Sequence, residues 1–124
     1  MNKKMDSDDK TMRLAVDLDG TLAHHMDPFD SKCIGSPMPG AMDAMKACMA
    51  AGHSVIIHTC RVNSDKQAPA MIKAWLKDNG FPDMPVWSQQ GKPDASLYLD
   101  NKGMHVCPED DPKAWSKVCK QLMM

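Results

Sequence analysis

Unbroken apolar runs alternate along the chain with segments in which apolar residues recur every three or four positions. The runs at 12–16 and 54–59 predict two buried strands, and shorter strands are predicted at 85–87, 96–99 and 105–106. Unbroken apolar strands are typical of parallel sheets, because such sheets are covered on both faces. The pattern therefore favours a parallel sheet.

Helical spacing occurs at 41–51, at 65–79 and in a C-terminal segment that begins near Pro112. Gly52 and Gly80 stand where the first two helices should end, and Asp110-Asp111-Pro112 is a typical helix start. The apolar stripes of the three helices are Met42, Met45, Cys48 and Met49; Met71, Ile72, Trp75 and Leu76; and Trp115, Val118, Cys119 and Leu122.

Strands that alternate with helices form βαβ units with right-handed crossovers. We therefore expect an α/β fold, a Rossmann-like three-layer sandwich with a mostly parallel central sheet. A chain of 124 residues fits one domain, which we place at 11–124 after a flexible polar tail at 1–10.

Charge and composition argue against several classes of protein. The formal net charge is −1, which gives no indication of a nucleic-acid or membrane surface. Five cysteines without a Cys-x-x-Cys pair favour a reducing cytoplasm over a disulfide framework. No apolar run approaches the roughly 20 residues of a membrane span, and the N-terminal residues do not resemble a signal peptide. The 13 methionines are scattered, which favours core packing over soft-metal binding.

Polar residues follow three of the predicted strands. Asp17 and Asp19 come after the first strand, Thr59 ends the second, and Asp100 follows the strand at 96–99. Lys92 lies in the loop before that strand. Because ligands bind at the carboxyl ends of parallel strands, we expect these side chains to gather at one site.

Two carboxylates spaced like Asp17 and Asp19 face the same side and repel each other, which a divalent cation such as Mg²⁺ would relieve. One carboxylate could then attack phosphorus and form an acyl phosphate. The other could protonate the leaving oxygen and later deprotonate water. Lys92 and the Thr59 hydroxyl could hold the phosphoryl oxygens, and Gly20 would let backbone amides point at them.

The segments Asp17-Leu18-Asp19-Gly20-Thr21, the apolar strand ending in Thr59, Gly91-Lys92-Pro93 and Leu97-Tyr98-Leu99-Asp100 occur in this order. They resemble the four motifs of the haloacid dehalogenase (HAD) superfamily. The segment Ile57-His58-Thr59-Cys60-Arg61 is also similar to a group of short HAD hydrolases, many of them carried by bacteriophages. The resemblance implies a Rossmann-like sheet and, in most members, hydrolysis of phosphate esters through an aspartyl-phosphate.

The same resemblance implies a role for each matching residue. Asp17 would be the nucleophile and Asp19 the general acid and base. Mg²⁺ would be held by Asp17, the backbone carbonyl of Asp19, and Asp100. The phosphoryl group would be bound by Thr59, Lys92 and the backbone amides of Leu18, Asp19 and Cys60.

Two features concern the rest of the family pattern. Many relatives have a second acid near the fourth-motif aspartate, but here Asn101 follows Asp100; Asn101 could still hold a metal-bound water. Only about twenty residues separate Thr21 from the helix at Ala41, too few for a large cap domain. The open site would suit a bulky substrate or a homodimer in which a second subunit covers it.

Several neighbouring residues allow two interpretations. Arg61 could contact substrate or form a structural ion pair. His24 or His25 could meet substrate, and together with Cys33 they match no standard zinc pattern. Trp87 could stack on a base or sugar, or pack in the core.

We therefore expect a cytoplasmic HAD-type phosphatase that uses Mg²⁺ and hydrolyses a phosphate monoester through Asp17. The alternatives are a phosphotransferase on the same scaffold and a non-catalytic module that binds a phosphorylated ligand or a protein. Nucleotides, sugar phosphates and polynucleotide ends are all open as substrates, and no membrane partner is expected.

Overall fold

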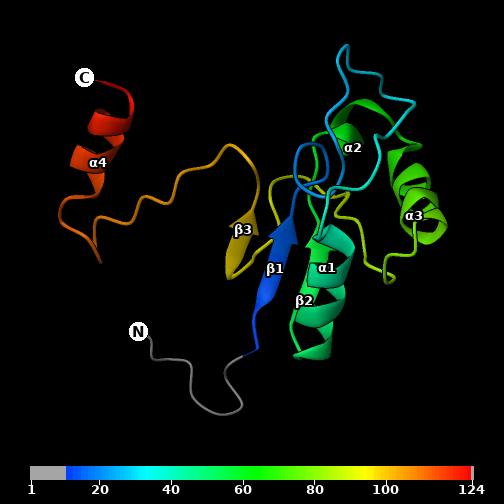
Figure 1. Ribbon diagram of the computed structural model, residues 1–124, viewed down its shortest axis with the longest axis horizontal. Helices are drawn as coiled ribbons and strands as arrows, with labels where there is room; N and C mark the ends of the chain where they lie inside the picture. Colours follow the sequence, from blue (N-terminus) through cyan, green and yellow to red (C-terminus); the bar gives the residue numbers. More distant parts are fainter. Residues whose placement is uncertain (1–10, 124) are drawn as a thin grey trace.

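The computed structural model of the chain describes residues 11–123, so the tail expected at 1–10 lies outside the described residues. Within this part, no helix has the length and apolar character that a membrane crossing requires. The elements in chain order are β1 (Arg13–Val16), α1 (Ala41–Ala50), β2 (Ser54–Ile57), α2 (Arg61–Ser64), α3 (Ala68–Asp78), β3 (Leu97–Leu99) and α4 (Ala114–Gln121) (Figure 1).

The strands form a three-stranded, all-parallel sheet in the order β2-β1-β3. The central strand β1 places Ala15 in register with Ile56 of β2 and with Tyr98 of β3. Beyond β2, Val86 makes a single parallel bridge with Ile57, so the strand predicted at 85–87 is reduced to one ladder position. The parallel sheet and its helical crossovers confirm the predicted α/β class.

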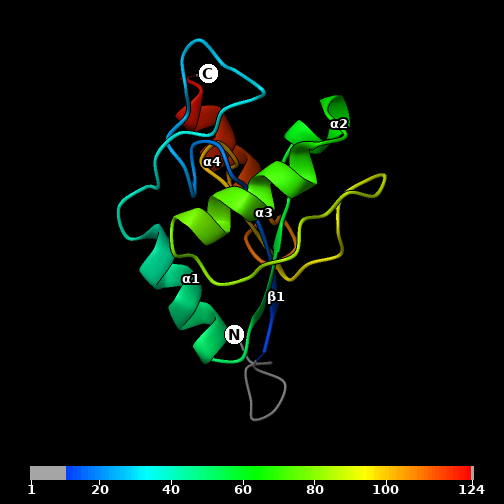
Figure 2. The ribbon, with the colours of Figure 1, turned by 90° about the vertical axis from the view of Figure 1, so that its right-hand side faces the viewer.

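One face of the sheet carries the core, because residues in register on neighbouring parallel strands point to the same side. Leu14 and Val16 of β1 are in register with Val55 and Ile57 of β2, and all four are buried. Figure 2 shows α1 and α3 beside the sheet. The helical side chains that complete the core cluster are Met45 of α1 and Ala68, Ile72 and Leu76 of α3.

The opposite face of the sheet is not covered by a helix within residues 11–123. This face carries the row Ile56–Ala15–Tyr98, and Tyr98 is 37% exposed. Figure 1 shows helix α4 set apart from the sheet, and its Trp115 and Leu122 are 63% and 62% exposed. The expected three-layer sandwich is therefore wrong on this side, because residues 100–113 lead α4 away from the sheet (Figure 1).

Two further predicted elements differ from the structure. The helix predicted at 65–79 begins only at Ala68, because the backbone at Asp65 is extended and its carboxylate accepts a hydrogen bond from the Gln67 amide (2.8 Å). A separate short helix, α2, precedes that break. The strand predicted at 105–106 is not formed, since the chain leaves the sheet edge after Asp100.

We predict that Ile72→Ala lowers the free energy of unfolding by about 2–5 kcal/mol, because the side chain is fully buried in the core. Trp115→Ala should change it by less than about 0.5 kcal/mol, because the indole is exposed. Urea unfolding followed by circular dichroism measures both. A large loss in the Trp115 variant would show that α4 packs on the sheet in solution.

Candidate functional site

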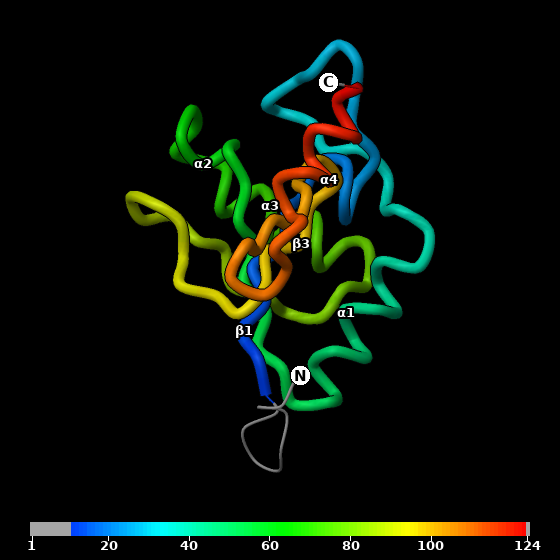
Figure 3. The backbone as a smooth tube through the Cα atoms, turned by 90° about the vertical axis from the view of Figure 1, so that its left-hand side faces the viewer, coloured from blue at the N-terminus to red at the C-terminus, as the bar shows by residue number. Residues whose placement is uncertain are grey.

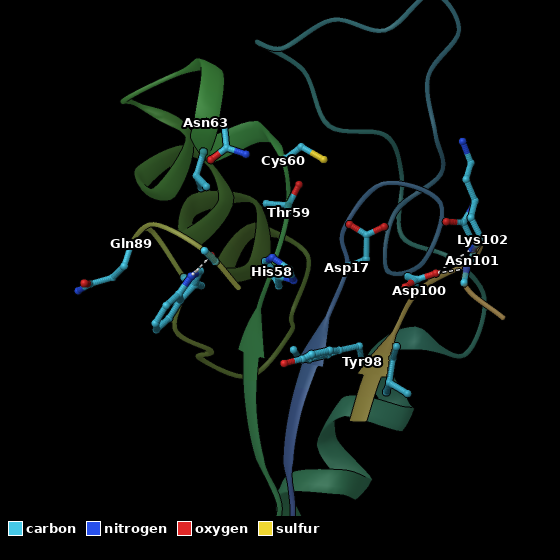
Figure 4. A pocket seen from close by; sticks show the side chains of 16 residues that line it. Asp17, His58, Thr59, Cys60, Asn63, Gln89, Tyr98, Asp100, Asn101 and Lys102 are labelled. Atoms are coloured by element: carbon cyan, nitrogen blue, oxygen red, sulfur yellow. Dashed lines mark hydrogen bonds between the residues drawn. The ribbon is translucent and has the colours of Figure 1, made fainter. Parts of the chain in front are cut away.

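The carboxyl ends of the three strands meet at one edge of the sheet. Asp17 follows β1, Asp100 follows β3, and Thr59 lies just beyond β2. All three line a cavity of about 480 Å³, the strand-end cavity (Figure 4). A second cavity of about 270 Å³, the flap cavity, is lined by Asp17, Asp19 and Thr59 among others. The structure thus brings together four of the predicted site residues.

Asp17 lies within an excess of negative charge. Its pKa is raised, first because the carboxyl group is partly buried, and then because the charges of Asp19 and Asp100 repel its ionised form. Two groups act in the opposite direction and lower the pKa of Asp17. The Leu18 amide donates a hydrogen bond to Asp17 Oδ1 (2.8 Å), and His58 lies nearby. Repulsion among three carboxylates is what a bound cation would relieve.

Arg61, the first residue of α2, is 3% exposed and binds Asp19. Its Nε donates to Asp19 Oδ2 and its Nη2 to Asp19 Oδ1, both at 2.8 Å. Two parallel hydrogen bonds of this kind are the strongest arrangement for a guanidinium and a carboxylate. Of the two interpretations of Arg61, the structure therefore shows the ion pair.

The same guanidinium holds the loop above the site, residues 24–36, which we call the flap. Arg61 Nη1 donates to the carbonyl of Ser31 (3.1 Å) and Nη2 to that of Cys33 (2.7 Å). The guanidinium carbon also lies 4.6 Å from the centroid of the Phe29 ring. Figure 3 shows the flap projecting at the end of the molecule opposite the start of β1. The described residues of this segment contain no helix, so a tethered loop joins the turn after β1 to α1.

Three groups at the strand ends can donate hydrogen bonds to a bound oxyanion. Thr59 is 5% exposed, and its Oγ1 accepts a hydrogen bond from the Arg61 amide (3.3 Å), which leaves the hydroxyl hydrogen available. Among residues 11–123, the amides of Asp19 and Cys60 have no protein acceptor. The Leu18 amide, in contrast, donates to Asp17 Oδ1 and orients that carboxylate.

The segment after β3 folds around the carboxylate of Asp100. Asp100 Oδ1 accepts hydrogen bonds from the amides of Gly103 and Lys102, which together lower the pKa of Asp100. Asn101, expected near a metal-bound water, lines both cavities and packs against Gly20. A β-carbon at Gly20 would come within 2.5 Å of Asn101 Nδ2, and Gly20 has a φ of +86°. Both space and backbone conformation therefore require glycine there.

Two of the predicted site residues, Lys92 and His24, line neither cavity. The Nζ of Lys92 lies 4.3 Å from the centroid of the Tyr98 ring, which stands on the uncovered sheet face and attracts the cation. Lys102 lines both cavities instead. His25, unlike His24, lines the flap cavity.

The strand-end cavity is also lined by residues to which sequence reasoning assigned no role, among them His58, Asn63, Gln89 and Tyr98. His58 lies between β2 and Thr59, and its ring meets that of Tyr98 at a centroid distance of 6.3 Å. Asn63 lies on α2, and Gln89 lies in the loop after Trp87. An alternating pattern along β3 would have indicated that Tyr98 points off the sheet, but three residues are too few to show one.

The possible metal ligands at the strand ends are oxygen atoms, the type that Mg²⁺ prefers. Among the residues that the structure describes, no three His, Cys, Asp or Glu side chains are grouped to hold a metal. Both carboxylate oxygens of Asp19 bind Arg61, so its backbone carbonyl remains, with the carboxylates of Asp17 and Asp100. Mg²⁺ is commonly held by one or two carboxylates, with water and substrate phosphate as further ligands.

Comparisons with known proteins bear on the fold. A scan against protein-family models and a search of curated proteins find no match. A solved structure of a conserved protein coded by a locus from Bacteroides thetaiotaomicron is similar, with a TM-score of 0.60 and 21% sequence identity. The similarity covers 91% of this chain and 90% of that one. It shows a shared small α/β fold over nearly the whole of both chains.

We predict that Arg61→Ala lowers the free energy of unfolding by about 3–5 kcal/mol, because it removes one partner of a buried ion pair. Arg61→Lys should recover little of the lost unfolding free energy, because an ammonium group cannot bind both Asp19 oxygens in parallel. The control is Lys73→Ala, which removes an exposed pair with Asp83 and should cost about 0–1 kcal/mol. Equal losses in urea unfolding for the Arg61 and Lys73 variants would contradict the assigned role.

Asp17→Asn should raise the midpoint of thermal unfolding at pH 7 in EDTA. A carboxyl group whose pKa is raised by folding destabilises the native state once it ionises, so stability falls as the pH rises through the folded-state pKa. The advantage of the variant should vanish at a pH below about 4, where Asp17 is protonated in both states. Calorimetry over a pH series tests this; a lower midpoint for the variant at pH 7 would be the opposite result.

Proposed function

We propose that this protein is a Mg²⁺-dependent phosphatase of the HAD type that hydrolyses a phosphate monoester through Asp17. The position of Asp17 carries the proposal. It follows the central strand, shares a cavity with Thr59 and Asp100, and has Oδ1 oriented by the Leu18 amide. A carboxylate that is partly desolvated and held in one orientation is suited to attack an electrophile. The resemblance of four motifs supports the same assignment.

The chemistry has two steps. An Asp17 oxygen forms a bond to phosphorus while the bond from phosphorus to the leaving oxygen breaks, and that oxygen takes a proton. Water then attacks phosphorus, loses a proton, and displaces Asp17 to give inorganic phosphate. The Thr59 hydroxyl and the amides of Asp19 and Cys60 stabilise the phosphoryl oxygens in both steps. A Mg²⁺ ion held by Asp17, Asp100 and the Asp19 carbonyl would supply charge neutralisation for these oxygens.

Asp19 is the residue proposed to transfer both protons. Its two oxygens each accept one hydrogen bond from Arg61, and a proton held by Asp19 would weaken this pair, because it neutralises the carboxylate charge. Because Arg61 also holds the carbonyls of Ser31 and Cys33, a change at Asp19 acts on the flap. Proton transfer and flap position are therefore linked in this proposal.

The Arg61–Asp19 pair also favours a second candidate function. If the pair with Arg61 kept Asp19 ionised throughout, Asp19 would carry no proton to give to the leaving oxygen. The protein would then bind a phosphorylated ligand at Thr59 and Asp17 without turning it over.

The wild-type protein with Mg²⁺ should release phosphate from p-nitrophenyl phosphate, and Asp17→Asn should reduce the rate at least about 10³-fold, because the nucleophile is lost. EDTA should have the same effect. Asp94→Asn is the matched control, since Asp94 is exposed and lines neither cavity, and it should retain the wild-type rate. Wild-type-like turnover by Asp17→Asn would refute the phosphatase assignment. Mg²⁺-dependent binding of beryllofluoride without turnover would favour the binding module.

A further inference from the structure

The strand-end cavity is larger than the proposed chemistry requires. Its volume of about 480 Å³ lies within the range of small-molecule sites. Asp17 and Thr59 account for the part where phosphorus would react. Trp87, Tyr98 and His58 line the same cavity and have no role in that chemistry. These residues are therefore available to recognise the rest of the substrate.

The two large rings are held in place through their own polar atoms. Trp87 Nε1 donates to the carbonyl of Gly91 (2.8 Å), and the Tyr98 hydroxyl donates to the carbonyl of Pro93. The backbone amide of Trp87 also donates to Ile57 of β2 (2.8 Å). Both rings thus have their donors satisfied by backbone, and they offer the cavity preorganised apolar surface.

Two amide side chains lie on the other side of the cavity from Asp100. Figure 4 shows Gln89 and Asn63 there, while Asp100 and Asn101 lie at the opposite side. Within residues 11–123, neither the Gln89 nor the Asn63 side chain forms a hydrogen bond to the protein. An amide offers both donors and an acceptor, the combination that matches the edge of a nucleobase.

We propose that the substrate of this site is a nucleotide, whose base is bound against Trp87 and Tyr98. This inference rests on the proposed phosphatase function. A planar base has faces that stack on aromatic rings and an edge that binds amides, and this cavity supplies both. A sugar phosphate without a base would leave the two rings and two amides unused. A free nucleotide and the phosphorylated end of a polynucleotide share this chemistry.

The test compares adenosine 5′-monophosphate with ribose 5-phosphate, which has the same ester but no base. The wild-type kcat/KM should be at least about 10-fold higher for the nucleotide, as base stacking would give. Trp87→Ala should remove most of this preference by raising KM for the nucleotide, and should change ribose 5-phosphate turnover less than about two-fold. Trp87→Phe keeps a ring and should keep most of the preference. Trp115→Ala, on the exposed α4, is the control and should leave kcat/KM unchanged for both substrates.

Equal kcat/KM values for the two substrates, or an equal loss on both in Trp87→Ala, would overturn the nucleotide assignment. If neither substrate is turned over, phosphatase function fails and the base site is tested separately by calorimetric binding of adenosine 5′-monophosphate. Saturable binding that Trp87→Ala abolishes would support the site, and its absence at millimolar nucleotide would overturn it. Faster release of phosphate from a phosphorylated oligonucleotide end than from the mononucleotide would also support the proposal. It would identify the substrate as a polynucleotide end.

Discussion

The bidentate pairing of Arg61 with Asp19 is the interaction on which the arrangement of the site depends. A guanidinium that is 3% exposed has to be compensated on all sides, because a buried charge without partners is costly. Its partners come from two separate segments, the turn after β1 and the flap, and Arg61 itself begins α2. These segments must therefore be in place together. The position of the flap follows from the same contact that positions Asp19.

The uneven covering of the sheet explains how so short a chain holds a cavity. The face that carries Leu14, Val16 and Ile57 is closed by α1 and α3 and forms the core. The other face carries Tyr98 and Ala15, and no described helix lies on it. A helix packed there would fill the space with apolar side chains, as in an ordinary three-layer fold. The absence of a described helix on this face leaves room for the strand-end cavity, which both Tyr98 and the buried Ala15 line.

The site concentrates like charge at the strand ends, at a cost in stability. Burial and the charges of Asp19 and Asp100 raise the pKa of Asp17, so the folded chain resists its ionisation. Asp19 is compensated by Arg61, and Asp100 by the amides of Gly103 and Lys102. Among the described residues, the side chain of Asp17 has the Leu18 amide as its single hydrogen-bond partner. This incomplete compensation is what makes Asp17 reactive in the proposed mechanism, and it is typical of functional sites.

Local patterns in the sequence were enough to predict β1, β2 and α1, because an apolar run or a helical stripe reports burial within a single element. The same patterns placed Asp17, Asp19, Thr59 and Asp100 at one edge, since parallel strands end on the same side of a sheet. Only the tertiary structure decided which side chains touch. It paired Arg61 with Asp19, 42 positions away in the chain, laid Lys92 on Tyr98, and left α4 off the sheet. Such contacts depend on register, rotamer and the path of loops, and no periodicity within one segment encodes them.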